Sequence, residues 1–156
     1  MTSRRFGVTE GVVVFEVLVI AACLAMPALH ATSNRQRAVR VAKEIRQVTA
    51  AAIAARGRTG AWPEPGVAGN VPASLKQHLP ARFKFDAGSY RLDWVHWRLS
   101  DGVDSFARRS EFVGVSVTTG DPQLLGLVTD LLGTDRMNFT VGNCATFVVS
   151  DTGLLP

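Results

Sequence analysis

The chain begins with a short polar stretch that leads into one long apolar run. Residues 12–31 read VVVFEVLVIAACLAMPALHA, in which Glu16, Pro27 and His30 are the exceptions to the apolar character. Twenty residues at 1.5 Å each make a helix of about 30 Å, enough to cross the hydrocarbon core of a bilayer. The run is therefore expected to be either a membrane anchor or an export signal.

The helical pattern continues beyond this run. Apolar residues recur at spacings of four, three, four and three, which marks one buried face of a helix: Val41, Ile45, Val48, Ala52 and Ala55. Arg56 and Gly57 then mark the end of the helix, because a cation in the last turn and a glycine after it are typical of helix C-termini. The pattern predicts one helix over 12–56, bent at Pro27, whose second half, 32–56, is amphipathic and packs on a head formed by 57–156.

The head shows alternating helix and strand signals. Residues 72–79 read as a short helix, and Asp121, Pro122 and Gly133 mark the start and end of another. Strand patterns cover 90–99, 113–118, 139–141 and 145–149, with a turn at 100–102 and a hairpin turn at Gly142-Asn143. These elements predict an α+β head with a small antiparallel sheet of roughly four strands.

Composition excludes several classes of function. With 17 Lys+Arg against 13 Asp+Glu, a formal charge of +4 and 47% apolar residues, the chain is neither disordered nor strongly polybasic. No nucleic-acid partner is predicted, because a charge of +4 gives little support for binding a polyanion. The sequence has no glycine-rich phosphate loop, no nucleophile elbow and no metal-ligand spacing around its three histidines. No enzyme, cofactor or metal is therefore predicted.

Glu16 is the residue of the apolar run that most needs an explanation. A carboxylate near the centre of a membrane helix costs roughly 2.5–3.5 kcal/mol, so it usually has a partner. The alternative is a tolerated polar residue near the membrane face, either protonated or extended toward water.

The spacing around Glu16 resembles that of the type IV pilin and type II secretion pseudopilin family. Gly11 matches the last residue of the family's short basic leader, Val12 the new and methylated amino terminus, and Glu16 the glutamate at the fifth position of the mature chain. The run from Glu16 to Ala21 also resembles the family's continuation. Thr59 to Pro63 resembles the segment that follows the long helix in many pseudopilins.

The resemblance implies a pilin-like fold, with a long helix that is transmembrane in its first half and packed on the head in its second. It implies a leader at 1–11, a transmembrane half at 12–31, and a subunit that assembles into a type II secretion pseudopilus or a type IV pilus. The implied partners are other pilin or pseudopilin subunits, a prepilin peptidase, an inner-membrane assembly platform and membrane lipid. The implied location is the bacterial inner membrane, single-pass, with the head in the periplasm or outside.

A physical argument accompanies the resemblance. Cleavage after Gly11 frees an α-amino group at Val12, and Glu16 of one subunit can pair with that cation on a neighbouring subunit. Such a head-to-tail contact propagates into a filament because it does not close.

The distribution of basic residues on the two sides of the apolar run favours a membrane orientation opposite to the one that the resemblance implies. Arg4 and Arg5 precede the apolar run, but five basic residues follow it, which taken alone reverses the topology that the family implies: Arg35, Arg37, Arg40, Lys43 and Arg46.

A second interpretation starts from Cys23. Residues 20–23, Ile-Ala-Ala-Cys, resemble a bacterial lipobox, in which the cysteine becomes an acylated amino terminus. That interpretation makes the chain a membrane-tethered or lipidated periplasmic binding domain. It also places Glu16 in a short apolar signal region, where a carboxylate is unfavourable. The simpler alternative for Cys23 is an unmodified, small apolar residue packed in a helix bundle.

The head offers few candidates for chemistry. Three tryptophans form either an aromatic binding face or part of the core: Trp62, Trp94 and Trp97. Six aspartates suggest calcium, although their spacing is not that of a calcium loop: Asp101, Asp104, Asp121, Asp130, Asp135 and Asp151. Cys144 and His96 with an aspartate would make the triad of an anchored hydrolase, and Asn138 begins a glycosylation triplet.

Overall fold

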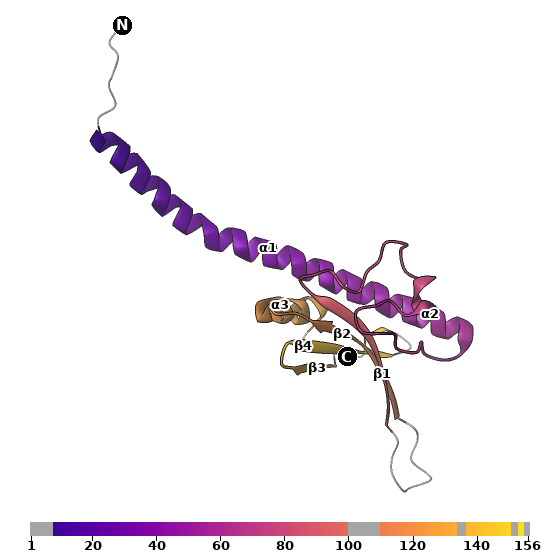
Figure 1. The fold of residues 1–156 in the computed structure, drawn as a ribbon. Helices are drawn as coiled ribbons and strands as arrows, with labels where there is room; N and C mark the ends of the chain where they lie inside the picture. Colours follow the sequence, from indigo (N-terminus) through magenta and orange to yellow (C-terminus); the bar gives the residue numbers. More distant parts are fainter. Residues whose placement is uncertain (1–7, 100–109, 134–136, 151–152, 155–156) are drawn as a thin grey trace. The chain divides into compact units, whose positions relative to one another are not determined.

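The computed structural model describes residues 8–99, 110–133, 137–150 and 153–154 (Figure 1). The chain divides into two compact units, 1–36 and 37–156. The long helix α1, Val8–Thr59, contributes to both. It begins four residues before the expected start at Val12 and ends three residues after the expected end at Arg56.

The described residues of the smaller unit belong to the first part of α1, and here the expectation of a transmembrane helix was wrong. Within the part of the chain that the structure describes, no helix combines the length and the apolar character that crossing a membrane requires. Glu16 interrupts the apolar stretch, and charged side chains follow from Arg35 onward. The expected transmembrane half at 12–31 and the single-pass location in the inner membrane are corrected accordingly.

Parts of that expectation fall outside the described residues. Residues 1–7 of the expected leader are among them. The side chains of residues 22 and 24–30, which include Pro27, are also outside the described part, although the backbone there is helical.

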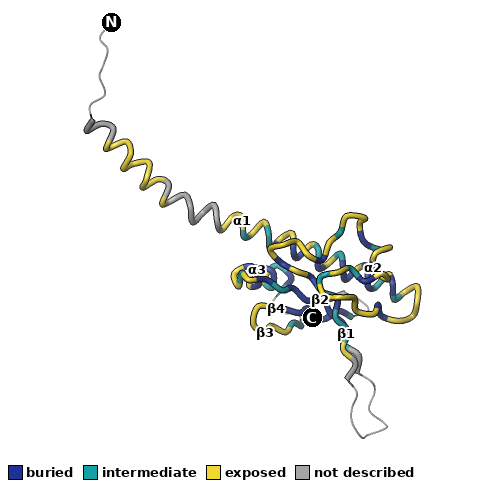
Figure 2. Tube along the Cα trace, in the orientation of Figure 1, coloured by how far each residue is buried: buried dark blue, intermediate teal, exposed yellow. Residues whose placement is uncertain are grey.

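The larger unit is built on the second half of α1. The predicted stripe of that half is confirmed, because each of its members is at most 3% exposed: Val41, Ile45, Val48, Ala52 and Ala55. Ala38, Ala42 and Ala51 widen the buried face. Alanine favours the helix and lets neighbouring elements approach closely, so this half of α1 combines high helix propensity with a buried surface (Figure 2).

An antiparallel sheet packs against this stripe. Its strands run in the order β1 (Arg91–Leu99), β2 (Ser110–Thr118), β4 (Cys144–Ser150) and β3 (Asn138–Val141), and the short β5 (Gly153–Leu154) also pairs with β4. The four expected strands are therefore confirmed, and β5 is additional. The hairpin turn is also confirmed, since Val141 pairs with Cys144 and Gly142 has a φ of 59°.

The register of the strands separates two faces. On the core face, three rows of apolar side chains join the cluster that contains the α1 stripe: Leu92, Val117 and Ala145; Trp94, Val115 and Phe147; Val113 and Val149. We call the opposite side the polar face, because its central rows carry charged, hydroxyl and thiol groups. Arg91 lies in one such row with Thr118 and Cys144, and Asp93 in the next.

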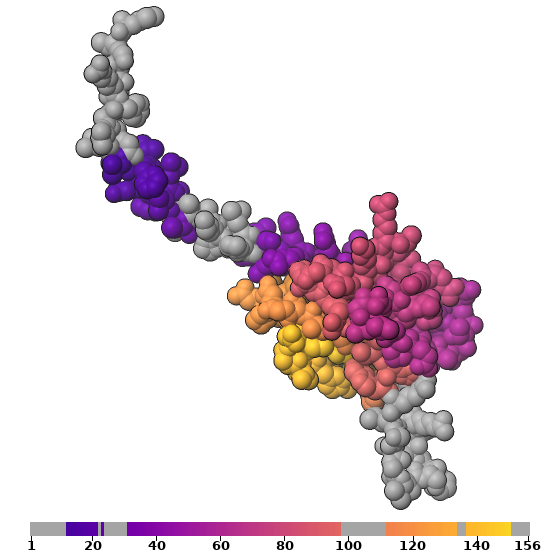
Figure 3. Space-filling view, viewed as in Figure 1, coloured from indigo at the N-terminus to yellow at the C-terminus, as the bar shows by residue number. Residues whose placement is uncertain are grey.

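Helix α3 (Pro122–Leu132) closes the core beside the sheet. Its predicted start is confirmed, because the Asp121 side chain accepts hydrogen bonds from the Gln123 and Leu124 backbone N–H groups. Its predicted end at Gly133 is confirmed as well. Arg46 of α1 donates a hydrogen bond to the carbonyl of Leu131 at 3.1 Å, which satisfies a carbonyl group at the end of α3. Figure 3 shows α3 beside the β3–β4 hairpin.

The segment after α1 wraps round the free edge of β1. Trp94 Nε1 donates to the carbonyl of Pro63 at 2.8 Å on the core face, whereas Gly69 N–H donates to Asp93 on the polar face. The chain then enters α2 (Ala73–Lys76), which is shorter than the expected 72–79 and buries Leu75. We call residues 63–70 the strap; it covers an edge that would otherwise be open to pairing. The turn expected at 100–102 lies outside the described residues.

Gly114 allows β2 and β4 to approach closely, which gives a test of the sheet. A Cβ at this position would lie 2.7 Å from the carbonyl oxygen of Phe147, a backbone atom that cannot move aside cheaply. We predict that Gly114→Ala lowers the free energy of unfolding by about 1–3 kcal/mol in denaturant titrations. Gly126→Ala is the matched control: it adds the same methyl group in α3 with no atom within 4 Å. It should raise stability by up to about 1 kcal/mol; an equal effect of both changes would contradict the packing.

Candidate functional site

The predicted processing and assembly residues lie within α1. Gly11, Val12 and Glu16 are all helical, and Val12 is 51% exposed. Val12 and Glu16 are four residues apart, so they lie about one helical turn from each other, roughly 6 Å along the axis. The side chain of Gly11's neighbour Glu10 is outside the described part.

Large apolar side chains surround Glu16 on every side of the helix. They are between 44% and 68% exposed: Val12, Val13, Val14, Phe15, Val17, Leu18, Val19 and Ile20. We call residues 12–20 the exposed apolar segment (Figure 2). Because consecutive helical positions point about 100° apart, no side of this segment is polar apart from Glu16. A helix that is apolar all round is stable in water only when something covers it.

Cys23 follows this segment and is an exposed free thiol in the single chain. Its packing in a bundle of helices stays a prediction. The basic residues that follow are mostly exposed on α1, including Arg35, Arg40 and Lys43. They do not form part of the buried stripe, and their side chains are solvated.

The tryptophans do not form one aromatic face. Trp62 and Trp94 are core residues with ring centroids 6.0 Å apart, and the Arg56 guanidinium lies 4.4 Å from the Trp62 ring centroid. Trp97 is 42% exposed and lies on the polar face, the opposite side of β1 from Trp94. The core interpretation is therefore confirmed for two of the three.

The hydrolase triad does not assemble. Along the paired strands Cys144 is opposite Thr118, whereas His96 is opposite Val113, five residues further along β2. At about 3.4 Å per residue this separates them by roughly 17 Å. They also belong to opposite faces of the sheet, since His96 alternates with Trp97 and Cys144 with Ala145.

The aspartates do not form a metal site in the described part of the chain, where no group of three or more His, Cys, Asp or Glu side chains is placed to hold an ion. Asp121 is the cap of α3, and Asp130 is exposed on the same helix. The other four aspartates of the calcium hypothesis lie outside the described residues: Asp101, Asp104, Asp135 and Asp151. Asn138 begins β3, where its glycosylation triplet is part of an edge strand.

Tyr90 joins the sheet to α1 through a hydrogen bond that sequence patterns did not indicate. Its hydroxyl donates to Glu44 Oε2 at 2.7 Å, and the Tyr90 side chain is 4% exposed. Burial, followed by the hydrogen bond to Glu44 and the charge of Glu44, raises the pKa of Tyr90 far above its usual value of 10.0, against a smaller opposite effect of Arg40. The phenol therefore stays neutral and keeps donating across the pH range in which proteins are usually studied.

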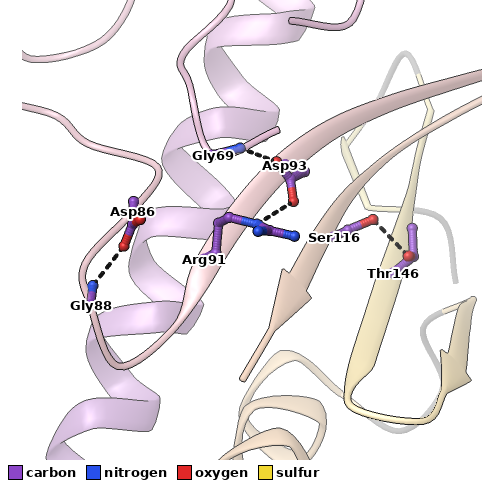
Figure 4. A network of polar contacts seen from close by, with 7 residues as sticks. All are labelled: Gly69, Asp86, Gly88, Arg91, Asp93, Ser116 and Thr146. Atoms are coloured by element: carbon purple, nitrogen blue, oxygen red, sulfur yellow. Dashed lines mark hydrogen bonds and ion pairs between the residues drawn. The ribbon is translucent and has the colours of Figure 1, made fainter. Parts of the chain in front are cut away.

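A polar cavity lies between the strap and the polar face of the sheet. Its volume is about 360 Å³, and its lining includes Arg91, Asp93, Ser116, Thr118 and Cys144. Arg91 Nε donates to Asp93 Oδ2 at 3.2 Å, and the Ser116 and Thr146 hydroxyls share a hydrogen bond of 2.7 Å (Figure 4). This space is a second candidate site, and we call it the polar cavity.

Sequence reasoning missed the polar cavity although part of its signal was present. Arg91 and Asp93 alternate with the apolar Leu92 and Trp94, which indicates a strand whose second face is polar. The strap that turns this face into a cavity is held by Gly69, whose φ of 76° and close contact with Arg91 cannot be read from residue types alone.

Comparisons with family models, with curated proteins and with solved structures give no match for this chain. The resemblance to the type IV pilins and pseudopilins therefore stays a prediction that depends on Gly11, Val12 and Glu16.

The Tyr90–Glu44 contact generates a prediction about pH. Because the pKa of Tyr90 is raised in the folded chain, its contribution to stability is complete below the unfolded pKa of 10.0 and decreases as pH rises above it. Tyr90→Phe should lose about 1 kcal/mol of unfolding free energy at pH 7. The difference between wild type and variant should shrink between about pH 10 and 11. Denaturant titrations at each pH measure it, and a difference that grows over this range would contradict the assignment.

Proposed function

We propose that the chain is a pilin-like structural subunit, a pseudopilin or minor pseudopilin, that polymerises through the exposed apolar segment of α1. It acts by assembly and not as an enzyme. Its partners are other pilin or pseudopilin subunits, a prepilin peptidase that cuts after Gly11, and an assembly platform of a type II secretion or type IV pilus system.

The observation that carries the proposal is the exposure of the apolar segment. Eight large apolar side chains in residues 12–20 are at least 44% exposed in the single chain. Covering surface of this kind with other apolar surface is favourable by about 25 cal/mol per Å². The same segment on other copies supplies a matching surface without polar groups to desolvate, apart from one carboxylate per subunit.

Glu16 gives the assembly its specificity. Once copies of the segment pack together, each Glu16 leaves water, and a buried unpaired carboxylate is strongly unfavourable. An α-amino group at a mature Val12 is a cation at neutral pH, because its usual pKa lies near 8. Pairing Glu16 with Val12 of a neighbouring subunit neutralises both groups and selects one axial offset between subunits.

The larger unit supports this role as a folded head with its own hydrophobic core. The second half of α1 is buried in its core, and the Arg46 and Tyr90 contacts tie α1 to α3 and to the sheet. In the proposed assembly this head is the part that meets cargo or other subunits.

Substitution of Glu16 tests the charge pair. Glu16→Gln keeps the size and removes the charge, so we predict that the fraction of subunit recovered in sheared, pelleted filaments falls at least about tenfold. Immunoblots of the pellet and of whole cells measure the fraction. Glu64→Gln, the matched control, alters an exposed glutamate of the larger unit and should polymerise normally. Normal incorporation of Glu16→Gln would remove the charge-pairing argument.

A further inference from the structure

We propose that the polar cavity binds the carboxylate group of a small organic ligand, in a site separate from the assembly segment. Its volume of about 360 Å³ falls within the range of small-molecule sites. All of its lining belongs to the larger unit: the strap forms one wall, and β1, β2 and β4 form the floor.

The floor of the cavity is made by two adjacent rows of the sheet. Arg91, Thr118 and Cys144 are opposite one another in the first row. Asp93, Ser116 and Thr146 form the second. Because side chains two residues apart on a strand point to the same side, both rows face the strap.

The cavity has more donors than its own acceptors use. The Ser116 and Thr146 hydroxyls carry two protons but share a single hydrogen bond, so one O–H remains to donate, although Ser116 is only 5% exposed. Within the described part of the chain, the Arg91 guanidinium donates to Asp93 through Nε. The four N–H groups of its two outer nitrogens remain to donate to a ligand. Thr118, which carries a further hydroxyl, lines the same space.

Asp93 orients Arg91, and both of its oxygens already accept hydrogen bonds. One of its oxygens accepts from the Gly69 backbone N–H and the other from Arg91 Nε. The aliphatic stem of Arg91 is also held under the strap, since a Cβ on Gly69 would lie 2.9 Å from Arg91 Cδ. Figure 4 shows the Arg91 side chain bonded to Asp93, with its guanidinium on the side where Ser116 lies.

A carboxylate is the acceptor that best fits this donor set. The outer nitrogens of an arginine match the two oxygens of a carboxylate, and such charge-assisted bonds are about twice as strong as neutral ones. The hydroxyl groups supply further donors beside it. A volume of about 360 Å³ limits the ligand to roughly the size of one or two amino-acid residues, so the carboxylate belongs to a free small acid or to the end of a peptide.

Calorimetric titration of the full chain tests the site. N-acetylglycine, which carries the carboxylate, should bind with a Kd near or below about 1 mM. N-acetylglycinamide has the same shape without the charge and should bind at least about tenfold more weakly. Acetyl-Ala-Ala distinguishes the two sources: tighter binding than N-acetylglycine indicates a peptide end, and weaker binding a free small acid. Equal binding of acid and amide, or no saturable binding of either acid, would overturn the proposal.

Two variants locate the binding. Arg91→Gln should weaken N-acetylglycine at least about tenfold, and Arg82→Gln, which removes an exposed guanidinium outside the cavity, should leave it unchanged. Arg91→Gln also removes a contact with the strap, so a second variant is needed. Thr118→Val removes one hydroxyl and leaves the strap unchanged, and it should weaken binding about threefold or more. Unchanged binding in both Arg91→Gln and Thr118→Val would show that the acid binds elsewhere.

Discussion

The larger unit depends on the packing of one helical stripe against one face of a sheet. Val41, Ile45 and Val48 of α1 are fully buried, and they meet rows of the sheet centred on Val115. Two hydrogen bonds add to this contact: Arg46 of α1 donates to the end of α3, and Tyr90, just before β1, donates to Glu44 of α1. Because interiors are close-packed, a change in this stripe is felt throughout the unit.

The two parts of α1 differ in how their apolar residues are arranged and covered. Between Val41 and Ala55 its buried apolar residues occupy one face and are covered by the chain itself. Over residues 12–20 they occupy all faces and are exposed. The first pattern is satisfied within one molecule, whereas the second leaves apolar surface that this molecule does not cover. This contrast is the physical basis for proposing a polymer, and Glu16 is the polar group that such packing has to accommodate.

Much of the larger unit was predictable because its signals are local. The stripe at spacings of three and four, the Asp121 cap and the Gly142 turn each depend on a few neighbouring residues, and the structure confirms them. The polar cavity was not predictable, since Arg91, Ser116 and Gly69 come together only through strand register and the strap. The transmembrane expectation was wrong, since no helix in the described part of the chain is both long and apolar enough to cross a membrane.

The most direct test of the account is the mass of the mature amino terminus, because the proposed charge pair exists only if cleavage frees an amine at Val12. Intact-mass and peptide mass spectrometry of the protein from its native cells should find a chain that begins at Val12. A chain that begins at Met1, or at an acylated Cys23, would contradict the proposed assembly, and the second outcome would favour a lipidated binding domain.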